Sequence, residues 1–380
     1  MNRVVFVLVA ILCLLSVSSI TGLIQVVRAD GAPIYINGDG SITPSTAPIY
    51  TADNITYTLT GNITTNANGI VIERNNIILN GKGYTVRGNN SGNLNDQSVG
   101  LNLTDTSNVL IEYVNIENFY EGIYLSGSSD NTISWTNVTA NGWDGIVIDS
   151  SSNNNVVSGN NVTANANIGI FLRTSSNNNV VSGNKATANS EGIDVGYSSN
   201  NTIVGNNVTA NGDSGIWLYY SSNNTVSGNN ATANYVGVYL YYSSNNVVSG
   251  NTASENNRAG IWLGGSSNNT LYHNNFIDNT LQAFCDGSGN TWDDGYPSGG
   301  NYWSDYQTRY PNAIQNDSSG IWSTPYVIDA NDIDHYPLMT QNTIPEFPSF
   351  LILPLFMIAT LLAVIIYKKK AILYGRLQSS

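Results

Sequence analysis

Residues 215–229 read GIWLYYSSNNTVSGN, and most of these positions recur in every neighbouring copy along the chain. The clear copies open with a glycine at residues 122, 145, 169, 192, 215, 237 and 260, and weaker copies open at residues 69 and 100. Successive clear copies are therefore 22, 23 or 24 residues apart. A fixed period of this length indicates a solenoid, in which each repeat is one coil stacked on its neighbours.

Each copy contains three short runs in which apolar and polar residues alternate, separated by turn residues such as Ser-Ser-Asn-Asn and Gly-Asn. Alternation with a period of two indicates β-strands, and no run is long enough or suitably spaced for a helix. The framework of a leucine-rich repeat is missing, and so are the regularly spaced aspartates of a nonapeptide calcium repeat. The repeat therefore predicts an all-β fold, a single-chain parallel β-helix with coils about 4.8 Å apart.

Two aliphatic positions in each coil predict the core. The first column consists of Ile123, Ile146, Ile170, Ile193, Ile216, Val238 and Ile261, and the second of Leu125, Ile148, Leu172, Val195, Leu218, Leu240 and Leu263. Burial of each such side chain contributes about 1.5–3 kcal/mol to the stability of the folded state. Asparagine pairs also recur in register, at residues 153/154, 177/178, 200/201, 223/224, 245/246 and 268/269. Because Asn tolerates positive φ and its amide can bond to the next coil, these pairs predict a structural asparagine ladder at a turn.

The two ends of the chain predict export and anchoring. Residues 1–29 are typical of a signal peptide, with Arg3 before an apolar run and small residues ahead of Asp30; an uncleaved anchor is the alternative. Residues 350–367 predict one transmembrane helix, since 18 residues span about 27 Å. The lysines that open the tail 368–380 place it in the cytoplasm.

The expected location is therefore the cell surface, with an extracytoplasmic β-helix on a single-pass membrane anchor. The order of Pro-Glu-Phe, apolar span and basic cluster also resembles an archaeal sorting signal at which the helix is replaced by a lipid. A permanent and a processed anchor both stay open.

Charge and cysteine content exclude some classes of protein. All 26 acidic residues lie between Asp30 and Glu346, together with seven of the 13 basic residues, which gives this segment a formal charge of 7 − 26 = −19. Such a surface repels nucleic acid and suits a saline exterior or a polysaccharide partner. Cys13 belongs to the predicted signal, so Cys285 has no partner for an intramolecular disulfide.

Domain boundaries follow from where the repeat starts and stops. We expect an N-terminal cap at residues 30–68, β-helix repeats at 69–278, an aromatic and Asp-rich C-terminal cap at 279–340, and a linker at 341–349. The caps are needed because the end of a solenoid exposes an unpaired apolar cross-section.

The C-terminal cap carries a specific resemblance. Residues 290–306 read NTWDDGYPSGGNYWSDY, followed by TPYVID at 324–329 and DHYPLM at 334–339. Glycine-rich coils that run into these motifs resemble the NosD-like parallel β-helix proteins common on archaeal cell surfaces, which are grouped with carbohydrate-binding and sugar-hydrolase β-helix domains. The resemblance covers roughly residues 33–340 and implies a right-handed β-helix in an extracytoplasmic setting. It does not settle an activity.

The founding members of that family assist the maturation of a copper enzyme, and copper favours imidazole, thiolate and thioether ligands. Between the predicted signal and membrane segments, this chain offers only His273, His335, Cys285 and Met339. The sequence therefore argues against a copper site, and we expect no cofactor.

Calcium is the remaining metal to consider. Relatives carry an Asp-Gly-Asp-like loop where this chain reads NDSSGIW at residues 316–322, which is poor in carboxylates. Asp293, Asp294 and Asp305 are the candidate calcium ligands if the cap brings them together. The alternative is that they are solvated or hydrogen-bonded loop acids.

Outward positions beside the second aliphatic column carry the candidate binding residues. They are Phe171, Trp217, Tyr219, Tyr239, Tyr241 and Trp262. Exposed aromatic rings beside polar groups suit the apolar faces of sugars, so this patch predicts carbohydrate binding. The alternative is that the rings only stabilise neighbouring strands.

The same outward face carries Asp149, Arg173 and Asp194, the one grouping of acids with a base that suits catalysis on a polysaccharide. A surface ion pair between the first two explains them equally well. Glu121, Asp144 and Glu191 precede the opening glycine of their coils and are expected to be solvated.

About a dozen Asn-x-Ser/Thr sequons are candidate glycosylation sites in an exported chain. They include Asn54, Asn102, Asn137, Asn161, Asn207, Asn230 and Asn268.

Three classes of function follow. The preferred hypothesis is binding of polysaccharide or cell-envelope glycans by the aromatic positions. The alternatives are a polysaccharide lyase, epimerase or hydrolase and a purely structural envelope component. The sequence identifies neither the ligand nor the oligomeric state.

Overall fold

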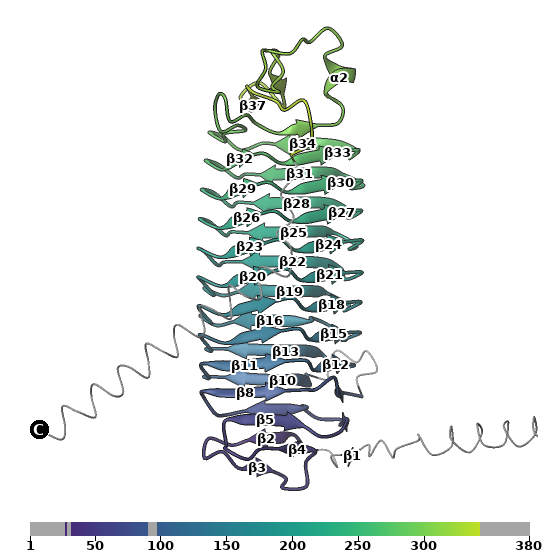
Figure 1. Cartoon of the computed structure of the whole chain (residues 1–380), viewed down its shortest axis with the longest axis vertical. Helices are drawn as coiled ribbons and strands as arrows, with labels where there is room; N and C mark the ends of the chain where they lie inside the picture. The colour runs from purple at the N-terminus through teal and green to yellow at the C-terminus, as the bar shows by residue number, and fades with distance from the viewer. Residues whose placement is uncertain (1–26, 29–31, 90–96, 343–380) are drawn as a thin grey trace, which may run out of the picture. The chain divides into compact units, whose positions relative to one another are not determined.

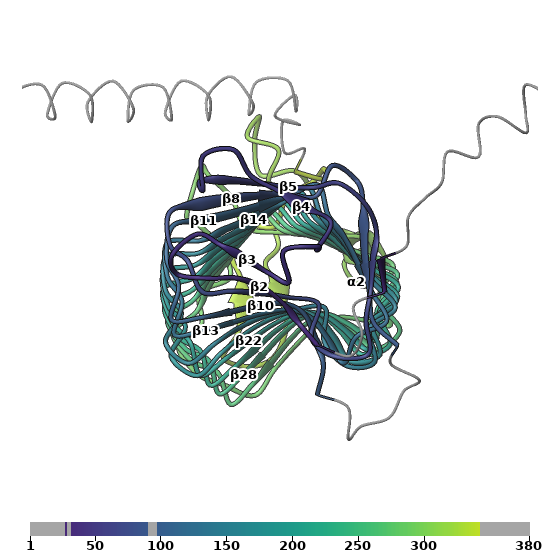
Figure 2. The same ribbon diagram turned by 90° about the horizontal axis from the view of Figure 1, so that it is seen from below.

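A computed structural model of the chain describes residues 27–28, 32–89 and 97–342. In this part the chain winds as a parallel β-solenoid, whose coils are stacked along one axis (Figure 1) and whose three sheets form the sides of each coil (Figure 2). The predicted all-β parallel β-helix is confirmed.

Sheet A has 12 strands, all joined in parallel. In spatial order they are β1 (Val27–Arg28), β6 (Ile63–Thr64), β9 (Thr85–Arg87), β12 (Asn115–Glu117), β15 (Asn137–Thr139), β18 (Asn161–Thr163), β21 (Lys185–Thr187), β24 (Asn207–Thr209), β27 (Asn230–Thr232), β30 (Thr252–Ser254), β33 (Asn275–Ile277) and β35 (Tyr302–Trp303).

Sheet B also has 12 strands, which include the longest ones of the coil. They are β3 (Ile42–Thr43), β2 (Ile34–Ile36), β7 (Ile70–Ile72), β10 (Val99–Thr104), β13 (Glu121–Ser126), β16 (Ile146–Asp149), β19 (Ile168–Arg173), β22 (Glu191–Gly196), β25 (Ser214–Tyr219), β28 (Val236–Tyr241), β31 (Ala259–Gly264) and β34 (Leu281–Cys285).

Sheet C has 11 strands. They are β4 (Ile49–Tyr50), β5 (Thr56–Leu59), β8 (Ile77–Asn80), β11 (Val109–Glu112), β14 (Thr132–Ser134), β17 (Val156–Ser158), β20 (Val180–Ser182), β23 (Thr202–Val204), β26 (Thr225–Ser227), β29 (Val247–Ser249) and β32 (Thr270–Tyr272).

The core consists of aliphatic columns that run through the coils. Ile216 of β25 pairs in register with Ile193 of β22 and with Val238 of β28, and all three are essentially inaccessible to solvent. Both aliphatic columns predicted from the sequence are buried throughout. Their burial follows from the period-two alternation of each strand, which directs every second side chain into the coil.

The opening glycine of each coil is required by the close approach of adjacent coils. A Cβ atom at Gly145 would lie 2.5 Å from the carbonyl oxygen of Gly169 and 2.5 Å from Cγ1 of Val162. No side chain fits at that separation. The glycine that marks the period in the sequence is therefore a packing requirement of the corner between sheets A and B.

Buried asparagines form a ladder at each of the three turns. In every ladder the backbone N–H of one Asn donates to Oδ1 of the equivalent Asn in the next coil. The ladders comprise Asn131, Asn155, Asn179, Asn201, Asn224, Asn246, Asn269 and Asn290 after sheet B; Asn160, Asn184, Asn206, Asn229, Asn251, Asn274 and Asn301 after sheet C; and Asn141, Asn165, Asn189, Asn211, Asn234, Asn256 and Asn279 after sheet A.

The predicted ladder is confirmed at the first of these turns, with a change of register. In the pair 223/224 the ladder residue is Asn224, whereas Asn223 adopts a positive φ of 59° in the turn. In the coils with three consecutive asparagines, the ladder residues are Asn155 and Asn179, one position beyond the predicted pairs. The other two ladders were not predicted.

Material outside the repeat closes both ends of the stack. At the first end β2–β3 and β4–β5 pair antiparallel, and the buried Tyr57 hydroxyl donates to the Gly40 carbonyl at 2.9 Å. At the other end lie α2 (Tyr306–Arg309) and the antiparallel pair β36 (Tyr326–Val327) and β37 (Ile333–Asp334). The indole N–H of buried Trp303 donates to Oδ2 of Asp334 at 2.9 Å.

The prediction of a membrane-anchored localisation is corrected. In the described part of the chain no helix has the length and apolar composition needed to cross a bilayer, and the one α-helix there, α2, has four residues. Such a helix is only about 6 Å long. A single-pass anchor with a cytoplasmic C-terminus is therefore not supported. The segment 350–367 itself lies outside the described residues, as do residues 1–26 and 29–31 of the expected signal.

Removal of one ladder side chain should be costly. Asn229 accepts from the backbone N–H of Asn206 and donates to the Ile203 carbonyl, each at 2.9 Å, so Asn229→Ala leaves two buried backbone groups unpaired. We expect the free energy of unfolding to fall by about 2–6 kcal/mol. Thermal unfolding of the full chain, followed by circular dichroism, measures the change.

The matched control is Asn230→Ala, because Asn230 is the exposed neighbour and lies outside the ladder. That change should cost less than about 0.5 kcal/mol. Equal unfolding midpoints for the two variants would contradict a stabilising role of the ladder.

Candidate functional site

The outer face of sheet B brings the predicted acidic and aromatic residues into one surface. Outward side chains of neighbouring strands are in register, so Asp194 of β22 lies between Phe171 of β19 and Trp217 of β25. Acidic residues lie on β13, β16 and β22 and in the turn before β16, and aromatic residues occupy β25 to β31. We call the first part, with Glu121, Asp144, Asp149, Arg173, Glu191 and Asp194, the acidic region.

Asp149 and Arg173 form an ion pair in the acidic region. Nε of Arg173 lies 3.0 Å from Oδ2 of Asp149, and the Tyr124 hydroxyl donates to the same oxygen at 3.1 Å. Burial by itself raises the pKa of Asp149, but hydrogen bonding from Thr174 and the charge of Arg173 outweigh burial and hold the pKa below its ordinary value. Asp149 is therefore ionised at neutral pH.

Asp194 is not part of that pair. It lies two strands away from Asp149, with β19 between them, and is offset by two residues along the strand, which together correspond to about 12 Å. Its side chain is 5% exposed, and Oδ1 has no hydrogen-bond partner in the described part of the chain. Burial, reinforced by the nearby Glu191 carboxyl, raises the pKa of Asp194 well above its ordinary value. The pKa values of the two carboxyls are therefore shifted in opposite directions.

The expectation that Glu121, Asp144 and Glu191 are solvated is wrong. Asp144 is fully buried, where its carboxylate accepts from the backbone N–H of Ile168 at 3.0 Å. Burial, together with the charge of Asp144, raises the pKa of Glu121 to about 7. Burial, together with Asp213 and then Asp144, raises the pKa of Glu191 to about 7 as well. Outward acids at this corner are covered by their neighbours, so water does not reach them freely.

These shifts predict a pH-dependent stability. The pKa of Glu191 is raised in the folded state, so the folded chain is stabilised relative to the unfolded chain when this carboxyl is protonated. That contribution to the free energy of unfolding is complete below the unfolded pKa of about 4.3 and is lost as the pH rises through about 7. Glu191→Gln cannot ionise. At pH 4.5 the variant and the unmodified chain should have the same thermal unfolding midpoint. At pH 8 the free energy of unfolding of the variant should be higher by about 1–3 kcal/mol.

Thermal unfolding at the two pH values tests this, with Glu73→Gln as the control because Glu73 is exposed. An unchanged pH dependence in Glu191→Gln would contradict the assignment.

Aromatic rings at the second part of the face stack between coils. We call Trp217, Tyr219, Tyr239, Tyr241 and Trp262 the aromatic patch. Trp217 is parallel to Tyr239, and Tyr219 to Tyr241, each with ring centroids 5.7 Å apart. The rings are only partly buried, so the stacks remain in contact with solvent.

Three further tyrosines, which are not among the binding residues predicted from the sequence, extend this surface. Tyr197, Tyr220 and Tyr242 occupy the turn after sheet B and are 58%, 44% and 49% exposed. Tyr220 is stacked between the other two, with centroid distances of 5.4 and 5.1 Å. The signal for Tyr220 and Tyr242 is the doubled tyrosine of LYY at residues 218–220 and 240–242, because the residue after the outward column begins the turn. Tyr197 occupies the same turn position after Gly196. We call these three the exposed tyrosine column.

Phe171, which was predicted to belong to the aromatic patch, is separated from its other rings. Its ring lies 5.2 Å from the Arg173 guanidinium carbon, and Asp194 separates it from Trp217. At the opposite end, the guanidinium carbon of Arg258 lies 4.0 Å from the Trp262 ring. Arg173 therefore lies within the acidic region, whereas Arg258 contacts the far end of the aromatic patch.

The candidate calcium ligands in the cap point to different partners. Asp293 contacts His335 Nδ1 at 3.2 Å, Asp294 accepts from the Ser298 hydroxyl at 2.8 Å, and Asp305 accepts from the Tyr326 hydroxyl at 3.1 Å. Within the described residues, no group of three His, Cys, Asp or Glu side chains is placed to hold a metal ion.

The residues with copper-type ligand atoms are also separate. His273 Nε2 lies 2.9 Å from the Ser298 carbonyl oxygen, whereas His335 contacts Asp293. Cys285 is buried at the end of β34, where burial raises the pKa of its thiol to about 12 and disfavours the thiolate. These residues do not fit a copper site.

The candidate glycosylation sites are mostly at the surface. Asn54, Asn137, Asn207, Asn230 and Asn268 are exposed, and Asn102 and Asn161 are partly exposed. Four of these residues open strands of sheet A, at β15, β18, β24 and β27. Their modification stays a prediction.

Two family models match the chain. Residues 172–308 match the model described as periplasmic copper-binding protein (NosD), and residues 25–186 match the model described as right handed beta helix region. No curated protein matches the sequence.

Several solved structures are similar. The periplasmic alginate epimerase AlgG is 14% identical, with 72% of this chain and 85% of that chain covered and a TM-score of 0.44. The A-module of mannuronan C-5 epimerase AlgE6 from Azotobacter vinelandii is 18% identical, with 70% and 89% covered and a TM-score of 0.47. The Dettilon tailspike protein is 17% identical, with 62% and 57% covered and a TM-score of 0.44. None of these similarities identifies an activity for this chain.

Proposed function

Because this chain is a NosD-like right-handed β-helix protein with an open aromatic surface on sheet B, we propose that it binds a polysaccharide or envelope glycan there. The single observation that carries the proposal is the exposed tyrosine column beside the aromatic patch. Exposed aromatic surfaces of this kind commonly mark binding sites, and rings with polar edges suit sugars.

The exposure of the column argues against a purely structural role. Rings that only stabilise neighbouring strands can be covered, as Trp292 and Trp303 are in the cap. Tyr197, Tyr220 and Tyr242 instead keep about half of their surface in solvent although they already stack on each other. Stacking fixes the rings in place before a ligand arrives, which lowers the entropy lost on binding.

Two glycines shape the end of this surface. A Cβ atom at Gly264 would lie 3.2 Å from Cδ2 of Tyr241, and one at Gly265 would lie 2.7 Å from Cε1 of Tyr242. The two rings therefore lean over the next coil where no side chain interferes. This arrangement leaves their outer sides accessible and supports a continuous contact surface for a glycan chain.

Copper binding, which the name of one matched family describes, is not transferred to this chain. Its nitrogen and sulfur ligand atoms lie at separate places, as described above, and the sheet B surface contains none of them.

Replacement of the exposed tyrosines tests the proposal. Asn tolerates the positive φ of 47° and 45° at Tyr220 and Tyr242, so Tyr220→Asn/Tyr242→Asn should fold and lose only the rings. We expect affinity for the best ligand in an oligosaccharide array to fall about tenfold, since each of the two rings removed supplies about 0.5–1.5 kcal/mol.

Tyr50→Asn is the control, because Tyr50 is also exposed but lies on β4 of sheet C. Equal binding by the double variant and the control would refute the sheet B site. An array without any ligand for the folded chain would favour a structural envelope component.

A second candidate function is catalysis on the bound glycan. The specific observation is that both acids lie on the outer face of sheet B with opposite pKa shifts, as a base and an acid require. Despite burial, hydrogen bonding from Thr174 and the charge of Arg173 hold the pKa of Asp149 below its ordinary value, and burial raises the pKa of Asp194 well above its own. The acidic region adjoins the aromatic patch along sheet B, so a glycan held by the rings would extend towards both acids. A lyase, epimerase or hydrolase is the class of enzyme that this arrangement fits.

Turnover would depend on Asp149 in that case. Asp149→Asn keeps the shape of the side chain but removes its charge, so turnover should fall at least about 100-fold. The release of reducing ends measures a hydrolase, the release of unsaturated sugars a lyase, and the change in sugar epimer composition an epimerase. Asp130→Asn, at an exposed turn, is the control. Unchanged turnover in Asp149→Asn, or no turnover of any bound glycan by the unmodified chain, would rule out this function.

A further inference from the structure

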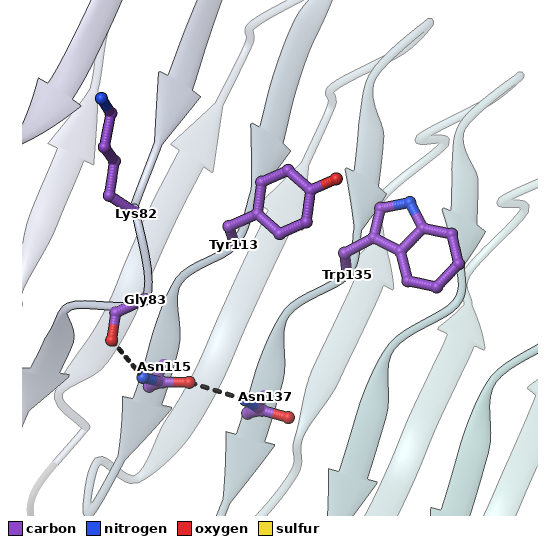
Figure 3. Close-up of a pocket in the computed structure, with 6 residues that line it drawn as sticks. All are labelled: Lys82, Gly83, Tyr113, Asn115, Trp135 and Asn137. Carbon is purple, nitrogen blue, oxygen red and sulfur yellow. Dashed lines mark hydrogen bonds between the residues drawn. The ribbon is translucent and has the colours of Figure 1, made fainter.

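A groove lies at the corner between sheets C and A, away from the outer face of sheet B. Figure 3 shows its lining, and its volume is about 350 Å³. The residues that line it are Lys82, Gly83, Tyr113, Asn115, Trp135 and Asn137. They come from three consecutive coils, since the strands that these turns connect are paired in register.

Two exposed rings form the apolar side of the groove. Tyr113 and Trp135 occupy the same turn position in adjacent coils, with φ of 54° and 53°, and are 48% and 52% exposed. Three atoms of the Trp135 ring lie 3.1–3.3 Å from the place of a Cβ atom on Gly159, so one face of the indole covers that glycine. The opposite face is not stacked on another ring of the described residues, in contrast to the tyrosines of sheet B.

A line of amides forms the polar side. The Asn137 amide donates to Oδ1 of Asn115 at 2.7 Å, and the Asn115 amide donates to the Gly83 carbonyl at 2.6 Å, as Figure 3 shows. These bonds fix both amides beside the rings. Oδ1 of Asn137 keeps its acceptor capacity for a ligand hydroxyl, and the Asn115 amide keeps one N–H.

The charge of the groove has the opposite sign to that of the chain. Lys82 is exposed, and its ammonium makes no ion pair within the described residues. None of the lining residues is acidic. The adjoining acids are engaged elsewhere, because Glu112 accepts from the Asn80 amide at 2.7 Å and Glu117 pairs with Arg87.

We propose that this groove binds an oligosaccharide that carries carboxylate groups, a uronate. The free face of Trp135 packs against one sugar ring, Asn137 and Asn115 bond to its hydroxyls, and Lys82 attracts a carboxylate further along the chain. Lys82 and Trp135 are two coils apart, about 10 Å, so a segment of two or three sugars connects them. The site is separate from sheet B and gives the protein a second point of attachment to a glycan.

The test uses the full chain made in a host without N-glycosylation, because a glycan on Asn137 would fill the groove. Calorimetry compares a galacturonate hexamer with the neutral hexamer of glucose, cellohexaose. Trp135→Asn removes the ring and tolerates the positive φ, so it should weaken binding of the galacturonate hexamer at least tenfold. Lys82→Gln should weaken it severalfold and reduce its salt dependence, without an effect on cellohexaose.

Matched controls separate this groove from general effects. Tyr50→Asn removes an exposed ring of sheet C, and Lys185→Gln removes an exposed cation of sheet A; both should bind the galacturonate hexamer as the unmodified chain does. The proposal would be overturned if Lys82→Gln and Lys185→Gln lost equal affinity for the galacturonate hexamer, or if Trp135→Asn bound it with unchanged affinity.

Failure here is distinguishable from failure of the proposed function. If the groove binds as proposed, Tyr220→Asn/Tyr242→Asn retains the Trp135-dependent binding of the galacturonate hexamer. If that double variant abolishes all binding and Trp135→Asn has no effect, the sheet B site stands and the groove does not.

Discussion

Each coil of this protein is held to the next by parallel strands and by asparagine side chains that complete the backbone hydrogen bonding of the turns. A parallel coil leaves turn N–H and carbonyl groups buried at its corners, and each unpaired group would cost about 1–3 kcal/mol. The ladder amides bond to both kinds of group, as Asn229 does with the Asn206 N–H and the Ile203 carbonyl. Equivalent bonds recur at all three corners, so the coil cross-section stays constant and side chains in successive coils remain in register.

Because the coils are in register, equivalent outward side chains of successive coils lie side by side and form a continuous surface. On sheet B, one position carries Asp194, Trp217 and Tyr239 in consecutive strands, so a change of residue along the column changes the chemistry of the face. The same principle produces the corner groove, where a turn position carries Tyr113 and then Trp135. The backbone is nearly uniform between these places, and functional differences therefore reside in which side chain the sequence assigns to a repeated position.

The periodic features were predictable from the sequence because they depend on the repeat alone. The aliphatic columns, including Ile216 and Leu218, and the outward position of Trp217 follow from period-two alternation. The burial of Asp144 does not follow from alternation, because it depends on side chains from adjacent coils that cover the corner. Likewise, Tyr220 lies in a turn whose direction the strand pattern does not specify. The location of the chain was predicted from residues 350–367, and no helix of the described residues supports that anchor.

Tyrosine footprinting of the full chain, with and without an oligosaccharide that it binds, tests the central claim most directly. A glycan on the outer face of sheet B should protect Tyr220 and Tyr242 from oxidation or iodination and leave Tyr50 as reactive as before, since all three are exposed in the free protein. Protection of Tyr50 or of the cap residue Tyr296, with Tyr220 and Tyr242 unchanged, would contradict a binding surface on sheet B.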